Sequence, residues 1–373
     1  MARNRGEKTL SVIFLQMKSK ERPKKFEENS TINLFLVGVG LIGKTLLEQI
    51  QEKNLNIRVC GLANRTSMLT DLEGITLSDW TRKLTKGQSS DIQKFVRQMI
   101  EMKAQGSVFV DCTAGEDVPL LYGDILSAGI PIVTPNKKAA SGTQDNYEKL
   151  KRIAVGHHAP FVYETNVGAG LPMIRTIARL VHSGDEILEI EAVLSGTHSY
   201  LWSAFLDGDK PFSEIVRDAQ MKGYTEPDPR DDLSGMDVAR KMLILARESG
   251  LKREIGDVHI VPLLSNECME AKSMTEFYTI LKKSDKDFER RKINAMKNNK
   301  VLRFIARLHK GKLDVSLQEV GKEHQAFGLS SGEQILILTT KRPGAEAIIV
   351  RGPGAGADVT VRGILANIKD IYQ

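Results

Sequence analysis

One stretch in the second half of the chain combines the residue types that perform acid–base chemistry. Residues 223–241 read GYTEPDPRDDLSGMDVARK, with five carboxylates between Glu226 and Asp237. Asp237 and Lys241 are four positions apart, so on a helix they share one face. The stretch could form a pocket for a substrate with an ammonium group, beside a lysine that moves a proton. The alternative is an acidic loop followed by an ordinary helix ion pair.

A second motif suits a dinucleotide. Residues 37–43 read VGVGLIG, which fits the spacing G-x-G-x-x-G between a predicted strand and a predicted helix. Gly38 allows the tight turn, Gly40 lets the backbone approach a pyrophosphate, and Gly43 allows the helix to pack on the strand. The intervening positions of the predicted site are Val39, Leu41 and Ile42. A glycine-rich turn without a ligand is the alternative, but this position in the chain favours dinucleotide binding.

The choice of cofactor depends on the end of the next strand. An NAD site usually has an acidic residue about 20 positions after the glycines, against the ribose 2′-hydroxyl. Residues 61–66 read GLANRT, with Ala63 and Arg65 but no carboxylate. An arginine can pair with a 2′-phosphate, which favours NADP, with NAD as the alternative. Arg65 could otherwise be a solvated loop charge.

Two later strand ends carry polar residues that could meet the same ligand. They read VDCTAG at 110–115 and VTPNKK at 133–138. Ligands of open α/β sheets lie beyond the carboxyl ends of the strands, which favours Thr113 as a neighbour of the nicotinamide. Lys137 could face cofactor and substrate, although taken alone it reads as a surface cation. Cys112 is interpreted as a small core residue, because no histidine lies near it in sequence.

The elements that must position these residues fall into two patterns. From residue 31 to about 165 strands alternate with helices, which predicts an α/β fold whose parallel sheet is covered on both faces. The expected strands are 32–37, 57–61, 107–112 and 130–133, and the expected helices are 44–53, 90–103 and 119–127.

Beyond about residue 165 the pattern indicates a second, α+β domain. Its expected helices are 171–182, 212–222 and 235–248. The expected strands are 187–194 and, in an antiparallel sheet, 301–308, 312–320, 334–340 and 347–351. A last helix is expected at 356–371. We therefore predict a short strand (9–16) and linker within residues 1–30, a Rossmann-type domain of residues 31–165 with 352–373, and a second domain of residues 166–351.

Composition excludes several classes of protein. The 373 residues are 41% hydrophobic and 27% charged, which is ordinary for a soluble globular protein of two domains. The longest uncharged runs have 15 residues, short of the about 20 that a membrane helix needs. A net charge of +6 and 6% aromatic residues argue against nucleic-acid binding. Three cysteines in no metal-binding spacing favour a reducing compartment, the cytoplasm.

Taken in order, these motifs resemble the homoserine dehydrogenases, especially the C-terminal half of the fused aspartokinase–homoserine dehydrogenases. The resemblance runs from about Ile32 to the C-terminus. Besides the acidic stretch, it rests on VDCTA at 110–114, TPNKKA at 134–139, ETNVGAGLP at 164–172, LSGTHSY at 194–200 and GPGAGADVT at 352–360.

The resemblance implies an NAD(P)-dependent enzyme of threonine, methionine and isoleucine biosynthesis that interconverts L-homoserine and L-aspartate 4-semialdehyde. It makes residues 166–351 the catalytic and dimerisation domain of a homodimer. It implies that Lys241 transfers the proton, that Lys137 lies near nicotinamide and substrate, and that Gly354 touches the cofactor. The residues implied at the amino acid are Gly196, Thr197, Gly223, Tyr224, Glu226, Asp232 and Asp237. A monovalent cation, sodium, would be bound by Glu164 and the carbonyl groups of Val167, Ala169 and Leu171.

These residue types suit the reaction. In reduction, negative charge develops on the aldehyde oxygen, which a nearby ammonium stabilises and protonates. In oxidation Lys241 must be neutral; a second cation such as Lys137 would favour that form, and nearby carboxylates would oppose it. The sequence leaves this balance open. One carboxylate with three backbone oxygens is a ligand set for an alkali or alkaline-earth ion.

Two other functions would use part of the same evidence. An aspartate-semialdehyde dehydrogenase would need a cysteine activated by a histidine, and neither Cys112 nor Cys268 lies in such a setting. A non-catalytic NADP-binding subunit of a separate kinase would keep the glycines and lose the lysines and acids, which are present. Residues 9–16 look like the tail of a regulatory region that precedes the dehydrogenase half in the fusions.

Overall fold

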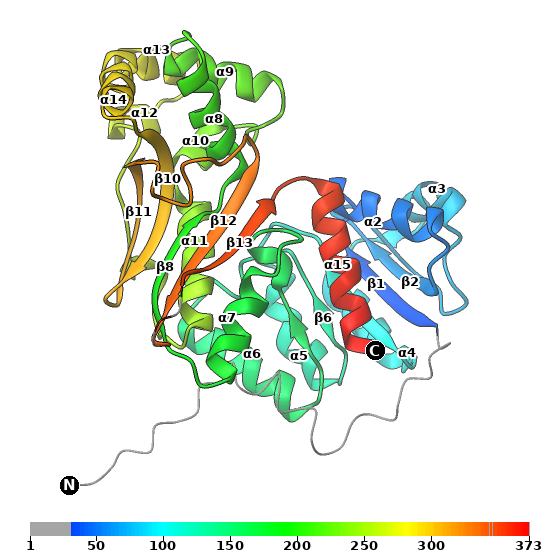
Figure 1. The fold of residues 1–373 in the computed structure, drawn as a ribbon. Helices are drawn as coiled ribbons and strands as arrows, with labels where there is room; N and C mark the ends of the chain where they lie inside the picture. Colours follow the sequence, from blue (N-terminus) through cyan, green and yellow to red (C-terminus); the bar gives the residue numbers. More distant parts are fainter. Residues whose placement is uncertain (1–30, 343, 345, 373) are drawn as a thin grey trace, which may run out of the picture. The chain divides into compact units, whose positions relative to one another are not determined.

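A computed structural model describes residues 31–342, 344 and 346–372 and divides them into two compact units (Figure 1). The first contains the described residues up to Gly170 and those from Gly356; the second is Leu171–Ala355. Residues 166–170 thus belong to the first unit and 352–355 to the second, a shift of four or five positions from the expected boundaries. The predicted strand 9–16 and its linker lie outside the described residues.

The first unit is built on a seven-stranded sheet in the order β4-β3-β2-β1-β5-β6-β7. The last five strands of that order are parallel, as predicted, while β3 and β4 form an antiparallel edge. Strands β2 and β5 lie on opposite sides of β1, so the strand order reverses there, where α/β sheets bind ligands. The strands are β1 (Ile32–Val37), β2 (Ile57–Ala63), β3 (Ser67–Thr70), β4 (Gln88–Ser89), β5 (Ser107–Asp111), β6 (Ile132–Val133) and β7 (Phe161–Val162).

Helices cover both faces of this sheet, and β1 is therefore buried on both faces. Leu34 and Leu36 pack in one cluster with α2 and α15, whereas Phe35 meets Phe95 of α4 edge to face, with ring centroids 6.4 Å apart. On the face of α4, Tyr122 of α5 packs against Phe109 of β5. The helices are α2 (Leu41–Glu52), α3 (Trp80–Thr85), α4 (Ile92–Met102), α5 (Tyr122–Ser127), α6 (Gln144–Gly156) and α15 (Ala357–Tyr372).

The C-terminal helix α15 completes the core of the first unit, as the sequence analysis expected. Figure 1 shows it, in red, beside α2. Its buried side chains join a cluster that includes Leu46 and Ile50 of α2, and they are Val361, Ile364, Leu365 and Ile368. The first unit therefore depends on two segments that are about 185 positions apart in the chain.

The second unit contains a six-stranded sheet in the order β13-β12-β8-β10-β11-β9. The four strands predicted for an antiparallel sheet, β10 to β13, lie in it together with β8, and these five strands pair antiparallel with one another. The edge strand β9, which was not predicted, pairs parallel with β11. Three residues are too short for a periodic signal. The strands are β8 (Ile187–Val193), β9 (Val258–Ile260), β10 (Val301–His309), β11 (Lys312–Val320), β12 (Glu333–Thr340) and β13 (Ile348–Pro353).

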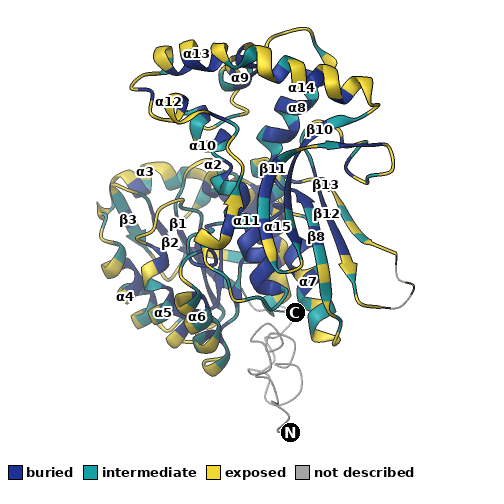
Figure 2. Ribbon diagram, turned by 90° about the vertical axis from the view of Figure 1, so that its left-hand side faces the viewer, coloured by how far each residue is buried: buried dark blue, intermediate teal, exposed yellow. Residues whose placement is uncertain are grey.

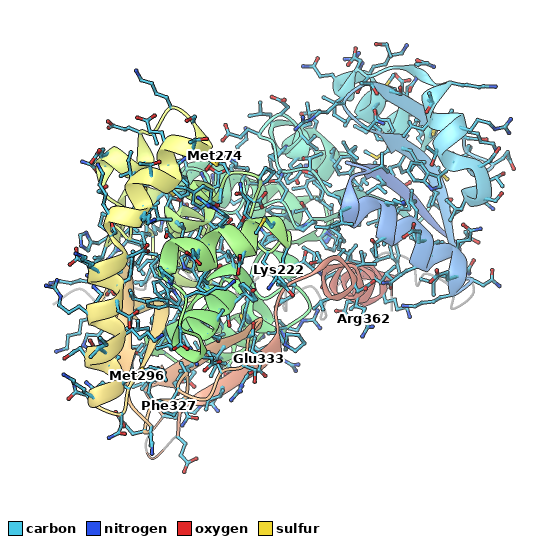
Figure 3. The ribbon with its side chains drawn as sticks, turned by 90° about the horizontal axis from the view of Figure 1, so that it is seen from above. Lys222, Met274, Met296, Phe327, Glu333 and Arg362 are labelled. Carbon is cyan, nitrogen blue, oxygen red and sulfur yellow. The ribbon has the colours of Figure 1, made fainter. Side chains whose placement is uncertain are left out.

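Eight helices accompany this sheet in the described part of the second unit. Figure 2 shows that α11 is largely buried, whereas α13 and α14 expose one face. On α14, Met296 (Figure 3) is 56% exposed. None of the described helices is long and apolar enough to cross a membrane. The helices are α7 (Met173–His182), α8 (Gly196–Asp207), α9 (Phe212–Met221), α10 (Pro229–Leu233), α11 (Met236–Glu248), α12 (Asn266–Met269), α13 (Met274–Lys283) and α14 (Asp285–Lys297).

Helix α8 was missed by the sequence analysis, although it carries part of the predicted substrate site. Its sequence, GTHSYLWSAFLD, has apolar residues around much of the helix and therefore little amphipathic signal. Trp202 stacks on Phe212 of α9, with ring centroids 4.9 Å apart, and Phe288 of α14 lies over the same ring of Phe212. Tertiary packing of these aromatic rings, rather than an amphipathic stripe, accounts for α8.

The fully buried Ile364 of α15 provides a test of the two-segment core. Ile364→Ala is expected to destabilise the first unit by about 2–5 kcal/mol, because it removes a buried side chain and leaves a cavity. Ile293→Ala on α14, where the side chain is 45% exposed, is the matched control and should cost far less. Denaturant unfolding, followed by circular dichroism, measures both; equal losses would contradict the assigned role of α15.

Candidate active site

The glycine motif forms the turn between β1 and α2. Gly38 has a φ of +92°, and a Cβ there would lie 2.7 Å from the carbonyl carbon of Cys112. A Cβ on Gly43 would lie 2.2 Å from the carbonyl oxygen of Gly38, so α2 packs directly on the turn. Gly40 is the N-cap of α2 and has open space beside it, and no described side chain caps the helix. This open helix N-terminus suits a pyrophosphate.

Arg65 lies at the exposed tip of the hairpin between β2 and β3. The side-chain oxygen of Asn64 shapes this tip by accepting hydrogen bonds from the two backbone N–H groups that follow Arg65, each at 2.8 Å. The carbonyl group of Ala63 accepts a hydrogen bond from the N–H of Gly38 at 2.9 Å. This hydrogen bond ties the hairpin to the glycine turn. Arg65, the residue after Asn64, therefore lies at the same edge of the sheet as the glycine turn.

A buried polar cluster lies at the ends of β5 and β6, and the sequence analysis did not assign it. Its centre is Asp111, with an exposed fraction of zero. The N–H of Thr113 donates to Asp111 Oδ1 at 2.7 Å, and the Tyr122 hydroxyl donates to Oδ2 at 2.6 Å. Asn136 Nδ2 donates to the same Oδ2 and to Thr113 Oγ1, both at 3.1 Å. The sequence did contain one signal for this cluster, which is the carboxylate of Asp111 at the end of the apolar run VFVD.

Lys137 follows Asn136 in the turn after β6 and is half-buried. The carbonyl group of Lys137 accepts hydrogen bonds from the N–H and the hydroxyl of Ser141, at 2.8 and 2.9 Å. The neighbouring Lys138 pairs with Glu116 at 2.7 Å, and its N–H donates to Asn136 Oδ1 at 3.0 Å. These hydrogen bonds give the turn a fixed shape.

The acidic stretch of the second unit folds around Asp232. The Asp232 carboxylate accepts a hydrogen bond from the N–H of Glu226 at 2.8 Å and lies 2.9 Å from the hydroxyl of Thr197 at the start of α8. The Thr197 hydroxyl is also 2.9 Å from the carbonyl oxygen of Tyr224. Burial raises the pKa of Asp232, and the hydrogen bonds from Glu226 and Thr197 oppose this rise. Several residues predicted for the substrate therefore lie together in this unit.

Other members of the stretch have structural tasks. Gly223, with a φ of +72°, ends α9 in a Schellman motif: its N–H donates to Gln220 O, and the N–H of Tyr224 donates to Ala219 O. Asp228 caps the short helix α10. Helix α11 has Gly235 as its N-cap, and the Ser234 hydroxyl accepts a hydrogen bond from the N–H of Met236 at 3.2 Å. Of the five carboxylates, Asp228 therefore has a structural task.

Lys241 lies on α11 with a side chain that is only 13% exposed. Its Nζ donates to the carbonyl oxygen of Leu194 at 2.8 Å and pairs with Asp237 Oδ2 at 2.8 Å. The predicted shared helix face is confirmed. Leu194 follows β8 and lies two residues before Gly196, so the ammonium lies where β8 gives way to α8. Two anchors from different elements hold it there.

His198 was not assigned by the sequence analysis but lies beside this region. It is 1% exposed, and its ring stacks on Phe304 with centroids 4.1 Å apart. Its Nε2 lies 3.0 Å from the carbonyl oxygen of Asp232, which suits a neutral ring that donates there. Burial lowers the pKa of His198 to about 4. The histidine is therefore neutral near pH 7 and joins α8 to the acidic stretch.

Gly196 and Gly354 meet the segment that follows β13. A Cβ on Gly196 would lie 2.8 Å from the Cβ of Ala355, and a Cβ on Gly354 would lie 2.4 Å from Gln334 Cδ. Gln334 Nε2 donates to the carbonyl oxygen of Gly354 at 2.6 Å. Within the second unit, then, the segment before α15 packs on the start of α8. Close packing explains both glycines, and the contact of Gly354 with a cofactor stays a prediction.

The residues predicted for a cation follow β7. Glu164 begins a single 3-10 turn, and Gly168 and Ala169 both have positive φ, +79° and +52°. The Ala169 carbonyl oxygen faces Gly363 of α15, while that of Leu171, the first residue of the second unit, accepts a hydrogen bond from the N–H of Met173 at 2.8 Å. The described chain has no cluster of three His, Cys, Asp or Glu residues that could hold a metal. The expected set contains one carboxylate, so hard oxygens would come mainly from the backbone.

The three cysteines are free thiols and unsuited to nucleophilic catalysis. Burial raises the pKa of Cys60 and that of Cys268 to about 11, and it raises the pKa of Cys112 further. A nucleophilic cysteine needs the thiolate, which these surroundings disfavour near neutral pH. This geometry speaks against the mechanism of an aspartate-semialdehyde dehydrogenase.

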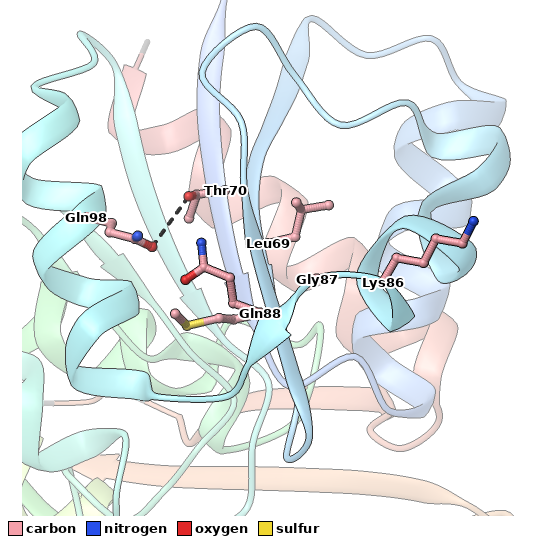
Figure 4. A pocket seen from close by; sticks show the side chains of 7 residues that line it. Leu69, Thr70, Lys86, Gly87, Gln88 and Gln98 are labelled. Atoms are coloured by element: carbon pink, nitrogen blue, oxygen red, sulfur yellow. Dashed lines mark hydrogen bonds between the residues drawn. The ribbon is translucent and has the colours of Figure 1, made fainter.

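A hollow of about 270 Å³ lies at the antiparallel edge of the first sheet (Figure 4). Thr70 and Gln98 form a weak hydrogen bond across it at 3.5 Å. Its lining contains none of the predicted site residues and consists of Met68, Leu69, Thr70, Lys86, Gly87, Gln88 and Gln98. We assign it no part in the site.

Comparison with known families covers both units. Residues 38–164 match the family model described as "Homoserine dehydrogenase, NAD binding domain", and residues 172–368 match the one described as "Homoserine dehydrogenase". The first model covers the glycine turn and the Asp111 cluster. The second covers the acidic stretch, α11 and most of α15.

Relatives of two kinds are similar to the chain. A bifunctional aspartokinase/homoserine dehydrogenase of Arabidopsis thaliana is 42% identical over 92% of this chain and 39% of its own length, and one of Haemophilus influenzae is 38% identical over 100% and 47%. The chain thus spans less than half the length of these bifunctional proteins. A homoserine dehydrogenase of Schizosaccharomyces pombe is 36% identical over 92% of this chain and 96% of its own length.

Solved structures share the fold. A Candida auris protein of unknown function has a TM-score of 0.82 at 30% identity, covering 91% of this chain and 98% of its own. A putative homoserine dehydrogenase of Archaeoglobus fulgidus has a TM-score of 0.74 at 23% identity, covering 92% and 99%. At that identity the second likeness concerns the fold alone.

Proposed function

The chain belongs to the homoserine dehydrogenase family, and from this premise we propose that it interconverts L-homoserine and L-aspartate 4-semialdehyde with NADP(H). The observation that carries the proposal is the double anchoring of Lys241 by Leu194 O and Asp237. A lysine held at 13% exposure beside an acidic stretch is suited to transfer a proton to a bound amino acid. A spectrophotometric assay of homoserine oxidation, with NADP and NAD compared, tests it.

Lys241 is the proposed acid and base. When bound, the nicotinamide cofactor supplies or accepts the hydride. In reduction, the Lys241 ammonium stabilises the negative charge that develops on the aldehyde oxygen and gives it a proton. The carboxylate of Asp237, 2.8 Å from Nζ, stabilises that ammonium. The sequence left the balance of charges at Lys241 open; this ion pair favours the proton-donating form.

The acidic stretch is the proposed site of the α-ammonium group of the amino acid. Asp232 holds the backbone of Glu226 and the hydroxyl of Thr197, so its main task is to shape the loop. Glu226, whose N–H is fixed by Asp232, then supplies a carboxylate for the substrate. Tyr224, which is 53% exposed and stacks on Tyr200 with ring centroids 4.3 Å apart, walls the site. Gly196 and Gly223 remain proposed members of the site through their backbone. Asp237 remains one through Lys241, with which it pairs.

The first unit fits a dinucleotide. The open space at Gly40, beside an uncapped helix N-terminus, is the cradle that a pyrophosphate needs. Arg65 would pair with the 2′-phosphate of NADP, and Thr113 and Lys137 would lie at the nicotinamide end. Lys137 would bring a second positive charge towards the substrate oxygen.

We propose two further properties from the same family resemblance. Glu164, Val167, Ala169 and Leu171 would bind a sodium ion; replacing NaCl by choline chloride should then lower the thermal midpoint of the protein, and an unchanged midpoint would speak against the site. The chain would form a homodimer, for which light scattering should give about twice 41.4 kDa, and a monomer mass would refute it. The free thiols suit a reducing compartment, which supports the cytoplasm.

Replacing Lys241 separates its proposed role from that of an ordinary ion pair. Lys241→Ala should lower kcat by roughly 10²–10⁴-fold, the usual effect of losing a positioned acid or base. Lys241→Arg should not restore turnover, because a guanidinium does not release its proton near neutral pH. Steady-state kinetics at saturating homoserine and cofactor measure both variants.

Lys210→Ala is the matched control, because Lys210 forms an exposed ion pair with Asp218 in the same unit. It should leave kcat unchanged. If Lys241→Ala kept near-normal kcat and lost only about 0.5 kcal/mol of stability, Lys241 would be a helix ion-pair partner. Lys137 would then be the next candidate.

Replacing Arg65 tests the cofactor. Arg65→Ala should weaken NADP binding while leaving NAD binding nearly unchanged, because only NADP carries the 2′-phosphate. Arg97→Ala, on the exposed side of α4, is the control. Titration of each variant with both nucleotides gives the ratio of dissociation constants; an equal loss for NADP and NAD would remove Arg65 from the site.

A further inference from the structure

Asp111 is a carboxyl group buried without a cation beside it. Three donors meet its two oxygens: the Thr113 N–H at 2.7 Å, the Tyr122 hydroxyl at 2.6 Å and Asn136 Nδ2 at 3.1 Å. The Thr113 N–H and Asn136 Nδ2 can only donate, one to each oxygen, so both carboxyl oxygens act as acceptors, as in the ionised form. Among the described residues, no lysine, arginine or histidine forms an ion pair with Asp111. Its charge is thus stabilised by hydrogen bonds alone.

The same carboxylate ties together two loops. Thr134 Oγ1 donates to the Asp111 carbonyl oxygen at 2.9 Å, and the N–H of Asn136 donates to Thr134 Oγ1 at 2.9 Å. Asn136 Nδ2 also reaches the carbonyl oxygen of Gly115 at 2.9 Å. The loop after β5 is therefore joined to the loop after β6. The first loop carries Thr113, and the second carries Lys137.

Such a carboxylate is costly to bury, which calls for a reason beyond stability. Burial raises the pKa of Asp111, while hydrogen bonds from Thr113, Tyr122 and Asn136 oppose the rise. A neutral amide side chain at this strand end would cost less free energy of desolvation than a carboxylate. A fixed negative charge at the carboxyl end of a central parallel strand lies where ligands of such sheets bind.

The charge of a nicotinamide changes with its redox state. The oxidised ring carries a positive charge and the reduced ring is neutral. Asp111 contacts Thr113, which the proposed function places at the nicotinamide end. A buried anion there attracts the oxidised ring and not the neutral, reduced ring, and low local polarity strengthens the effect. We propose that Asp111 positions Thr113 and the Asn136–Lys137 turn, and that its negative charge favours binding of the oxidised over the reduced cofactor. This inference rests on the nicotinamide site of the proposed function.

The test compares the binding of NADP⁺ and NADPH, without homoserine, to the full chain and to two variants. Asp111→Asn keeps the size of the side chain and removes its charge; it should weaken NADP⁺ about three- to thirtyfold more than NADPH. Tyr122→Phe removes one donor and keeps the charge, so it should leave the ratio of the two dissociation constants unchanged. Isothermal titration calorimetry gives the constants, and a thermal melt shows that each variant is folded.

In Asp111→Asn the new NH₂ group faces an N–H donor in either amide orientation, the Thr113 N–H or Asn136 Nδ2, and this variant can fail to fold. Asp111→Ser, whose hydroxyl can accept a hydrogen bond and which leaves room for water, then replaces it in the same titration. An unchanged ratio in the neutral variant, or a larger loss of NADPH binding, overturns the proposal. A wild-type chain that binds both nucleotides but does not oxidise homoserine would refute the proposed reaction and leave this inference intact.

Discussion

The parallel pairing of β1 with both of its neighbours is the constraint on which the candidate cofactor site depends. Because β1, β2 and β5 run in the same direction, the turns that follow them leave the sheet at one edge. Two hydrogen bonds tie these turns together: the Gly38 N–H donates to Ala63 O at 2.9 Å, and the Cys112 N–H donates to Val37 O at 2.8 Å. Glycine at position 38 is required because a Cβ there would collide with the Cys112 backbone. Arg65 and Thr113 are brought to this edge by the sheet.

In the second unit, the main constraint is to hold charged side chains in place. Its acidic stretch contains more carboxylates than a substrate needs, and the structure gives several of them local partners. Asp228 caps a helix, Asp232 holds the loop to Thr197, and Asp237 pairs with Lys241. The neutral, buried His198 adds a contact with the Asp232 backbone. The lysine is thereby fixed by groups from the end of β8 and from its own helix.

The first unit is built from two segments of the chain that flank the second unit in sequence. The first unit needs α15, whose buried residues follow the whole of the second unit in sequence. Its core is therefore incomplete without a segment that is synthesised after the second unit. The segment before α15 in turn packs against Gly196 within the second unit, through Ala355. The glycines at 196 and 354, in the two stretches that resemble family motifs (194–200 and 352–360), are thus explained by packing.

The sequence by itself determined the fold class, the parallel order of β–α units, the glycine turn and the i,i+4 pair of Asp237 and Lys241, because these depend on local periodicity and spacing. It missed several elements, among them α6, α8, α13, α14 and β9. Helix α8 is apolar on most sides, and β9 is too short for a pattern. It gave no hint that Asp232 and Thr197, 35 positions apart, would share a hydrogen bond. It also left Asp111 unassigned, because a buried carboxylate is recognised only by the donors that the folded chain brings around it: partners from separate strands and loops meet through long-range packing, which only the tertiary structure decides.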